Sequence, residues 1–75
     1  MNRNKFLELF IEKNDIETDL TEDTKLEDIE EWDSLAAVTT IALFYKELGI
    51  KINASNIKEC NTVKDILDLG IEKYE

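Results

Sequence analysis

A chain of 75 residues has room for one domain, and a domain of this size buries only about 60% of the surface that its unfolded chain exposes. Its 18 acidic against 9 basic residues give a net charge of -9, a negative field that repels nucleic-acid phosphates and anionic membranes and attracts basic patches on proteins. The single cysteine excludes an internal disulfide, and the lack of histidine excludes the usual zinc sites and a Ser-His-Asp hydrolase. No apolar run approaches the roughly 20 residues that are needed to cross a bilayer.

The first predicted element is an amphipathic helix over residues 3–13. Its apolar residues recur at helical spacing: Phe6, Leu7, Leu9, Phe10 and Ile11. Residues 14–33 then break into short polar and acidic groups with an apolar residue at intervals, which predicts a long connection held against the core. Connections of this length are often functional. Thr24-Lys25-Leu26-Glu27 is expected to cap a brief helical turn within it.

The central predicted element is a helix that starts at Asp33 or Ser34 and ends at Gly49. Either of the first two side chains can accept a hydrogen bond from the free N–H groups of the first turn. Gly49 is expected to adopt the left-handed conformation of a C-cap. Two adjoining faces of this helix are apolar, and Leu35 is expected to point into the bundle. One face carries Leu35, Val38, Ile41, Ala42 and Tyr45, and the other carries Ala37, Phe44 and Leu48.

The last third of the chain predicts an extended link at residues 50–52, a short helix within residues 53–58 and a final helix. Thr62-Val63-Lys64-Asp65 resembles a capping box that opens this last helix, and Gly70 weakens or ends it. The apolar residues expected to face inward from it are Ile66, Leu67 and Ile71. The predicted fold class is therefore all-α, a small bundle of three longer helices and one short helix, with a long loop between the first two.

Three segments of the chain resemble the acyl carrier protein family: Glu-Glu-Trp-Asp-Ser-Leu at residues 30–35, Glu-Leu-Gly-Ile at residues 47–50, and Thr-Val at residues 62–63. The resemblance covers nearly the whole chain. It implies that Ser34 receives 4'-phosphopantetheine from coenzyme A, with Asp33 and Leu35 as the flanking residues of the motif. A helix N-terminus suits this attachment because its exposed N–H groups and positive dipole end favour a phosphate. In that family the thiol of the arm holds the cargo as a thioester, while partner enzymes catalyse the reactions.

The resemblance implies that the protein is a non-catalytic acyl or aminoacyl carrier and that residues 1–75 form a single acyl carrier domain. The implied partners are a phosphopantetheinyl transferase, an acyl or aminoacyl ligase, and a downstream transferase or synthase. We expect a cytoplasmic monomer, since the polar start of the chain has no apolar core of signal-peptide length. No catalytic residue, metal site, nucleic acid or membrane contact is expected.

Glu30, Glu31 and Glu47 are the candidate docking residues for basic side chains of these partners. Many fatty-acid carriers of the family bear further acids along the exposed face of the helix that follows the serine, and this chain departs from that pattern. The matching positions hold Ala36, Thr39, Tyr45 and Lys46. The departure favours a dedicated biosynthetic pathway, with housekeeping fatty-acid carriage as the alternative.

Three further residues have two interpretations each. Trp32 is expected to plug the loop against the bundle rather than to serve as a ligand platform. Cys60 is expected to be a small structural residue rather than a nucleophile, because no base is available to activate it. Thr40 stands where the family usually has an aliphatic residue. Its hydroxyl either bonds the carbonyl one turn back, or it makes an acyl pocket less suited to a long alkyl chain.

Other functional classes remain as alternatives. Acidic residues of the long loop fall at ligand positions of a possible calcium loop, but Thr24 stands where the sharp turn needs glycine. These candidate ligands are Asp19, Thr21, Asp23 and Glu30. A carrier-like interaction domain that is never modified, and binds a partner groove through its central helix, is the second alternative. An acidic mimic of nucleic acid would explain the charge but not the placement of Asp-Ser-Leu.

Overall fold

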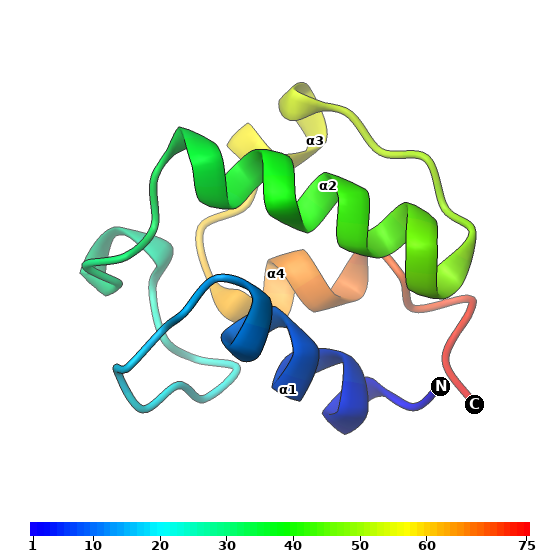
Figure 1. Cartoon of the computed structure of the whole chain (residues 1–75), viewed down its shortest axis with the longest axis horizontal. Helices are drawn as coiled ribbons and strands as arrows, with labels where there is room; N and C mark the ends of the chain where they lie inside the picture. Colours follow the sequence, from blue (N-terminus) through cyan, green and yellow to red (C-terminus); the bar gives the residue numbers. More distant parts are fainter.

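The computed structural model describes all residues from 1 to 75 as an all-helical bundle, which confirms the predicted fold class (Figure 1). Its elements are α1 (Arg3–Lys13), a 3-10 turn η1 (Leu26–Asp28), α2 (Ser34–Leu48), α3 (Ala54–Lys58) and α4 (Val63–Asp68). Helix α2 packs against α1 and α3, and α4 packs against α1. The last helix is shorter than expected, since it ends at Asp68. None of the helices combines the length and the apolar sequence needed to span a bilayer.

The core is built from apolar side chains of every helix and of the long loop. The ring of Phe44 in α2 lies 4.6 Å from the ring of Phe6 in α1, and Tyr74 approaches Phe6 from another side at 6.0 Å. Offset and tilted aromatic pairs of this kind contribute beyond the area that they bury. The completely buried side chains are those of Phe6, Phe10, Thr40, Phe44, Val63, Ile66 and Leu67.

Local hydrogen bonds set three helix ends where the sequence predicts them. The carboxylate of Asp33 accepts the N–H of Ala36 at 2.9 Å, so Asp33 is the N-cap of α2. Gly49 closes the helix in the left-handed region, with φ of 68°. At the start of α4, Thr62 and Asp65 each accept a backbone N–H of the other, which confirms the predicted capping box.

The long loop between α1 and α2 is held by backbone hydrogen bonds to the segment before α4. The Leu26 N–H donates to the Asn61 carbonyl at 2.9 Å, and the Val63 N–H donates to the Thr24 carbonyl at 3.0 Å. The prediction that Thr24 caps the helical turn is wrong, because its hydroxyl instead accepts the N–H of Thr21. The loop therefore lies against α4 and positions the residues just before α2.

Four large apolar side chains lie on the surface, and three of them belong to α2. Leu35 is 71% exposed, so the prediction that it points into the bundle is wrong, and Val38 and Tyr45 are exposed as well. Ala36, expected at an exposed docking position, is buried instead. Neighbouring residues of a helix are rotated by about 100°, and packing against α1 selects the face that carries Phe44.

The fourth exposed apolar residue lies near the C-terminus. Ile71 is 61% exposed, which contradicts its expected inward orientation. It follows the end of α4, in a turn where its N–H donates to the carbonyl of Asp68. Beyond this turn the chain returns to its start: the Glu75 N–H donates to the Met1 carbonyl at 3.1 Å, and both termini lie side by side in Figure 1.

Candidate functional site

Ser34 is the first residue of α2, and its side chain is exposed. The preceding Asp33 caps the helix, so the backbone that carries the serine is fixed. The first turn contains no acidic side chain, and its backbone N–H groups have no acceptor within the helix. The hydroxyl is thus presented to solvent from a rigid backbone, at a helix end whose dipole favours an anion.

An apolar groove of about 560 Å³ opens beside Ser34, between α2 and α3. Its apolar walls come from the long loop, α2, α3 and the residue Cys60: Leu26, Trp32, Ala37, Val38, Ile41, Ala54, Ile57 and Cys60. Glu27, Asp33 and Lys58 add charged groups to the lining. No pattern of the sequence predicts this groove, because it forms only where segments distant in the chain pack together.

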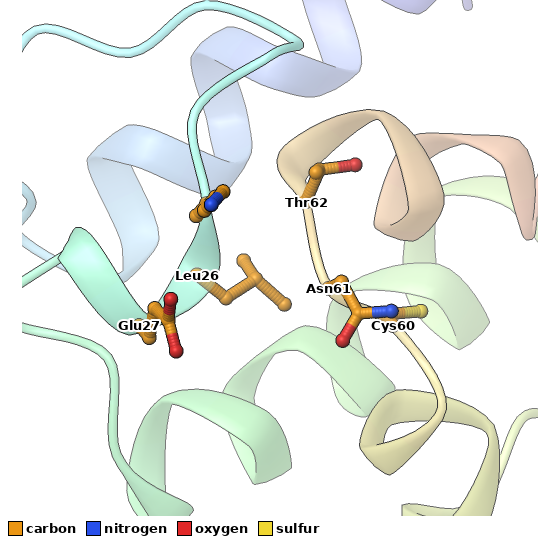
Figure 2. A pocket seen from close by; sticks show the side chains of 6 residues that line it. Leu26, Glu27, Cys60, Asn61 and Thr62 are labelled. Atoms are coloured by element: carbon orange, nitrogen blue, oxygen red, sulfur yellow. The ribbon is translucent and has the colours of Figure 1, made fainter.

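Cys60 lines this groove and also a neighbouring hollow of about 310 Å³. Figure 2 shows the second hollow, in which Leu26 projects from η1 toward the segment that carries Cys60 and Asn61. The Cys60 thiol donates to the Asn56 carbonyl at 3.3 Å. Burial, reinforced by the charge of Asp65, raises the pKa of the thiol to about 11. A protonated, half-buried thiol agrees with the structural role expected for Cys60.

Trp32 is half-buried and joins the end of the long loop to α1. Its ring lies 5.7 Å from the ring of Phe10, and it also forms part of the groove wall. This packing agrees with the expected role of a plug. The residue therefore holds the segment before Ser34 against the bundle.

The three candidate docking acids do not form one cluster. Glu30 is exposed in the loop just before α2, whereas Glu47 lies thirteen residues after Ser34, about 20 Å along the helix. The carboxylate of Glu31 accepts the N–H of Glu17 at 3.0 Å and the hydroxyl of Thr18 at 3.4 Å. The Glu17 N–H holds the pKa of Glu31 below its usual range. Glu31 thus fastens the loop after α1 to the segment before Ser34, a role that its sequence neighbours do not reveal.

Thr40 is completely buried and has its hydrogen bonds satisfied. Its hydroxyl donates to the Ala36 carbonyl at 2.8 Å and accepts the Asn14 side-chain amide at 3.4 Å. The first interpretation of Thr40 is therefore confirmed. Thr40 is absent from the lining of the groove, so the second interpretation, a polar residue in an acyl pocket, finds no support.

Replacing Thr40 with valine is expected to change the free energy of unfolding by less than about 1 kcal/mol. The change removes the Thr40 hydroxyl and with it both of its hydrogen bonds, while the Asn14 amide keeps its bond to the Phe10 carbonyl at 3.0 Å. Urea denaturation of the two proteins measures the difference. A loss above about 2 kcal/mol would show that the hydroxyl is indispensable to the helix pair.

The calcium hypothesis finds no support in the geometry. The structure contains no group of three or more acidic or cysteine side chains that could hold a metal ion. The Thr21 hydroxyl, one of the candidate ligands, is engaged with the Asp23 N–H at 3.3 Å.

The family model for a phosphopantetheine attachment site matches residues 4–69. The chain belongs to this family of carrier proteins. Among solved structures, the carrier is similar to the solution NMR structure of holo acyl carrier protein from Geobacter metallireducens, with a TM-score of 0.75 and 26% sequence identity. That similarity covers 96% of this chain and 84% of the other. A search of curated protein sequences finds no significant match.

These comparisons confirm the resemblance to acyl carrier proteins. The prosthetic group of such carriers is 4'-phosphopantetheine. In this carrier the matched residues include the complete α2, with the exposed Ser34 at its start.

Proposed function

We propose that Ser34 carries the 4'-phosphopantetheine arm and that the protein presents an acyl or aminoacyl cargo to partner enzymes. The observation that carries this proposal is the exposed Ser34 hydroxyl at the N-terminus of α2, within the residues matched by the family model. When bound, the arm supplies a terminal thiol that holds the cargo as a thioester. The protein itself, as one carrier domain, acts as a tethered substrate and leaves catalysis to its partners.

The residues around Ser34 fit such a group. Asp33 already caps one N–H of the first turn and keeps the serine backbone rigid, while other N–H groups of that turn remain available to a phosphate. Leu35 points outward beside the serine, where an enzyme that modifies Ser34 would contact it. The apolar groove beside Ser34 would give an attached apolar cargo partial shelter from water.

Loading of the purified protein tests this assignment. The wild type is incubated with coenzyme A and a promiscuous phosphopantetheinyl transferase, and its intact mass is measured. Ser34 and Ser55 are the only serines of the chain, and Ser55 is also exposed near the start of a helix. We expect a single phosphopantetheine increment on the wild type and on Ser55→Ala, and none on Ser34→Ala.

Two results would contradict the assignment. An increment on Ser34→Ala would move the attachment elsewhere. No increment on folded wild type, while a control carrier is modified in the same tube, would favour a carrier-like interaction domain that is never modified.

We also propose that the carrier serves a dedicated biosynthetic pathway, with its own acyl or aminoacyl ligase and a downstream transferase or synthase. Glu47 is the only acid within α2, which makes this helix a poor match for enzymes that dock through arginine and lysine. Glu30 and Glu31, just before Ser34, are the acids best placed to guide the phosphopantetheinyl transferase. The mass of the cargo on carrier isolated from its native cell distinguishes the alternatives, since a series of long alkyl chains would indicate housekeeping fatty-acid carriage.

A further inference from the structure

The segment that leads into Ser34 contains a tight turn. The Trp32 N–H donates to the Ile29 carbonyl at 3.1 Å, so Glu30 and Glu31 are the two central residues of a β-turn. Ile29 is buried and Trp32 is half-buried, so both flanks of the turn lie against the bundle. The two central side chains differ, because Glu30 is exposed and Glu31 is half-buried.

Glu31 joins this turn to the end of α1. One carboxylate oxygen accepts the Glu17 N–H at 3.0 Å, and the other accepts the Thr18 hydroxyl at 3.4 Å. We call these two hydrogen bonds the Glu31 clasp. The segment that the clasp grips is itself fixed, because the Ile16 N–H donates to the Ile11 carbonyl at 3.0 Å and the Ile16 side chain is buried. Hydrogen bonds are directional and apolar contacts are not, so the clasp fixes where the turn lies relative to α1.

Ser34 lies just after this turn, so its position depends on where the turn lies. Only Asp33 stands between the turn and α2, and its carboxylate caps the Ala36 N–H at 2.9 Å. The Ser34 side chain is exposed, and the backbone around it therefore decides where its hydroxyl points. A turn that moved relative to α1 would pull on the Asp33 cap and displace the first turn of α2.

Loading with phosphopantetheine is a reaction that depends on such small displacements. Ser34 Oγ attacks the coenzyme A phosphorus that bears the pantetheine oxygen, and a new Oγ–P bond forms. The P–O bond to the other phosphate of the diphosphate breaks, adenosine 3',5'-bisphosphate leaves with the electron pair, and the serine proton passes to a base of the transferase. Phosphoryl transfer needs the attacking and leaving oxygens nearly in line, so a displaced hydroxyl reacts more slowly.

We infer that Glu31 is a positioning residue for the loading of Ser34, because the Glu31 clasp keeps the hydroxyl where the transferase can bring it in line. This role rests on the proposed function. The neighbouring Glu30 has the same charge, but its side chain is exposed. The charge of either acid acts on the approach of the transferase and therefore on KM. The clasp acts within the bound complex and therefore on kcat.

Paired substitutions at the two positions separate the clasp from the charge. Glu31→Gln is neutral but keeps both contacts, because its carbonyl oxygen accepts the Glu17 N–H and its amide donates to the Thr18 hydroxyl. Glu31→Ala loses both contacts. With loading followed by mass spectrometry, we expect Glu31→Ala to lower kcat about tenfold and Glu31→Gln to lower it less than about threefold. Glu30→Gln and Glu30→Ala should raise KM by equal factors, and high salt should reduce this effect.

Hydrogen exchange of the Glu17 amide, measured by NMR on the protein before loading, reports the clasp directly. Because this N–H donates to the Glu31 carboxylate, we expect its exchange to be several-fold faster in Glu31→Ala than in Glu31→Gln, two variants of equal charge. Arg3→Met is the control for a general loss of stability, since it removes the ion pairs of Arg3 with Glu22 and Asp68 and leaves the turn unaltered. Its kcat should remain within about twofold of the wild-type value.

Equal kcat values for Glu31→Ala and Glu31→Gln would overturn the positioning role, since these variants differ only in the clasp. A loss of kcat in Arg3→Met as large as that in Glu31→Ala would also overturn it, because stability alone would then explain the effect. Failure of the wild type to load has a different meaning: it would refute the proposed function, and the positioning role with it. Exchange of the Glu17 amide would then still show whether the clasp itself exists.

Discussion

Replacing Phe44 with alanine is expected to lower the free energy of unfolding by about 3–5 kcal/mol. Phe44 is completely buried, and its ring contacts that of Phe6 at 4.6 Å. The loss combines the transfer of the ring to water with the cavity that remains. A domain of this size has a total stability of roughly 4–11 kcal/mol, so the variant should lose a large part of it. Thermal and urea denaturation, followed by circular dichroism, measure the difference.

The next residue of α2 provides the control for this substitution. Tyr45 is also aromatic but is 58% exposed, so Tyr45→Ala is expected to change the unfolding free energy by less than about 1 kcal/mol. Equal losses for Phe44→Ala and Tyr45→Ala would contradict the orientation of α2 described above. That orientation also places Leu35 and Val38 at the surface.

Replacing Arg3 with methionine is expected to cost about 1–2 kcal/mol at pH 7, because two carboxylates lose a common cation. The guanidinium donates to Glu22 Oε1 at 3.0 and 2.7 Å and to Asp68 Oδ1 at 2.7 Å. These contacts join α1 to the long loop and to α4. All three side chains are partly exposed, at 25 to 37%, and solvent screening therefore moderates the effect. Methionine retains the apolar part of the side chain near Tyr74.

The contribution of Arg3 is expected to depend on pH. Its guanidinium lowers the pKa of Glu22, while Lys64 and Arg3 together lower the pKa of Asp68. A carboxyl group with a lower pKa in the folded state stabilises that state fully above its unfolded pKa, near 4, and this stabilisation disappears as the pH falls through the folded pKa. The difference between wild type and Arg3→Met should thus shrink from pH 7 to about pH 2.

Urea denaturation across this pH range tests the expected trend. Lys5→Met is the control. The Lys5 ammonium lies 3.7 Å from the Glu8 carboxylate, and both side chains are exposed, so this pair should contribute less than about 0.5 kcal/mol at pH 7. A difference between wild type and Arg3→Met that stays constant from pH 7 to pH 2 would show that Arg3 acts through packing rather than through its two ion pairs.

The helix ends were predictable because they depend on neighbours in the sequence. Asp33 caps α2 with an N–H three residues away, Gly49 needs only its own conformational freedom, and Thr62 and Asp65 satisfy each other within one turn. The resemblance to acyl carrier proteins uses the same short segments, and it is confirmed by the family match. Ser34 as the attachment residue is still a prediction.

The orientation of side chains was less predictable, because it depends on contacts between distant segments. The two apolar faces of α2 are similar in composition, and only packing against α1 decides that Phe44 is buried while Leu35 is exposed. The sequence makes Glu31 a candidate docking residue, yet its carboxylate accepts the N–H of Glu17, fourteen residues earlier. Periodicity identifies candidate faces, and tertiary contacts select among them.

The contact between the two chain ends has a practical consequence for handling the molecule. In Figure 1 the termini lie beyond the C-terminal end of α2, whereas Ser34 opens the other end of that helix. The fifteen residues of α2 span about 22 Å. Either terminus therefore offers an anchoring point for a tag, a fluorophore or a sensor surface, and immobilisation through it would leave Ser34 oriented away from the support.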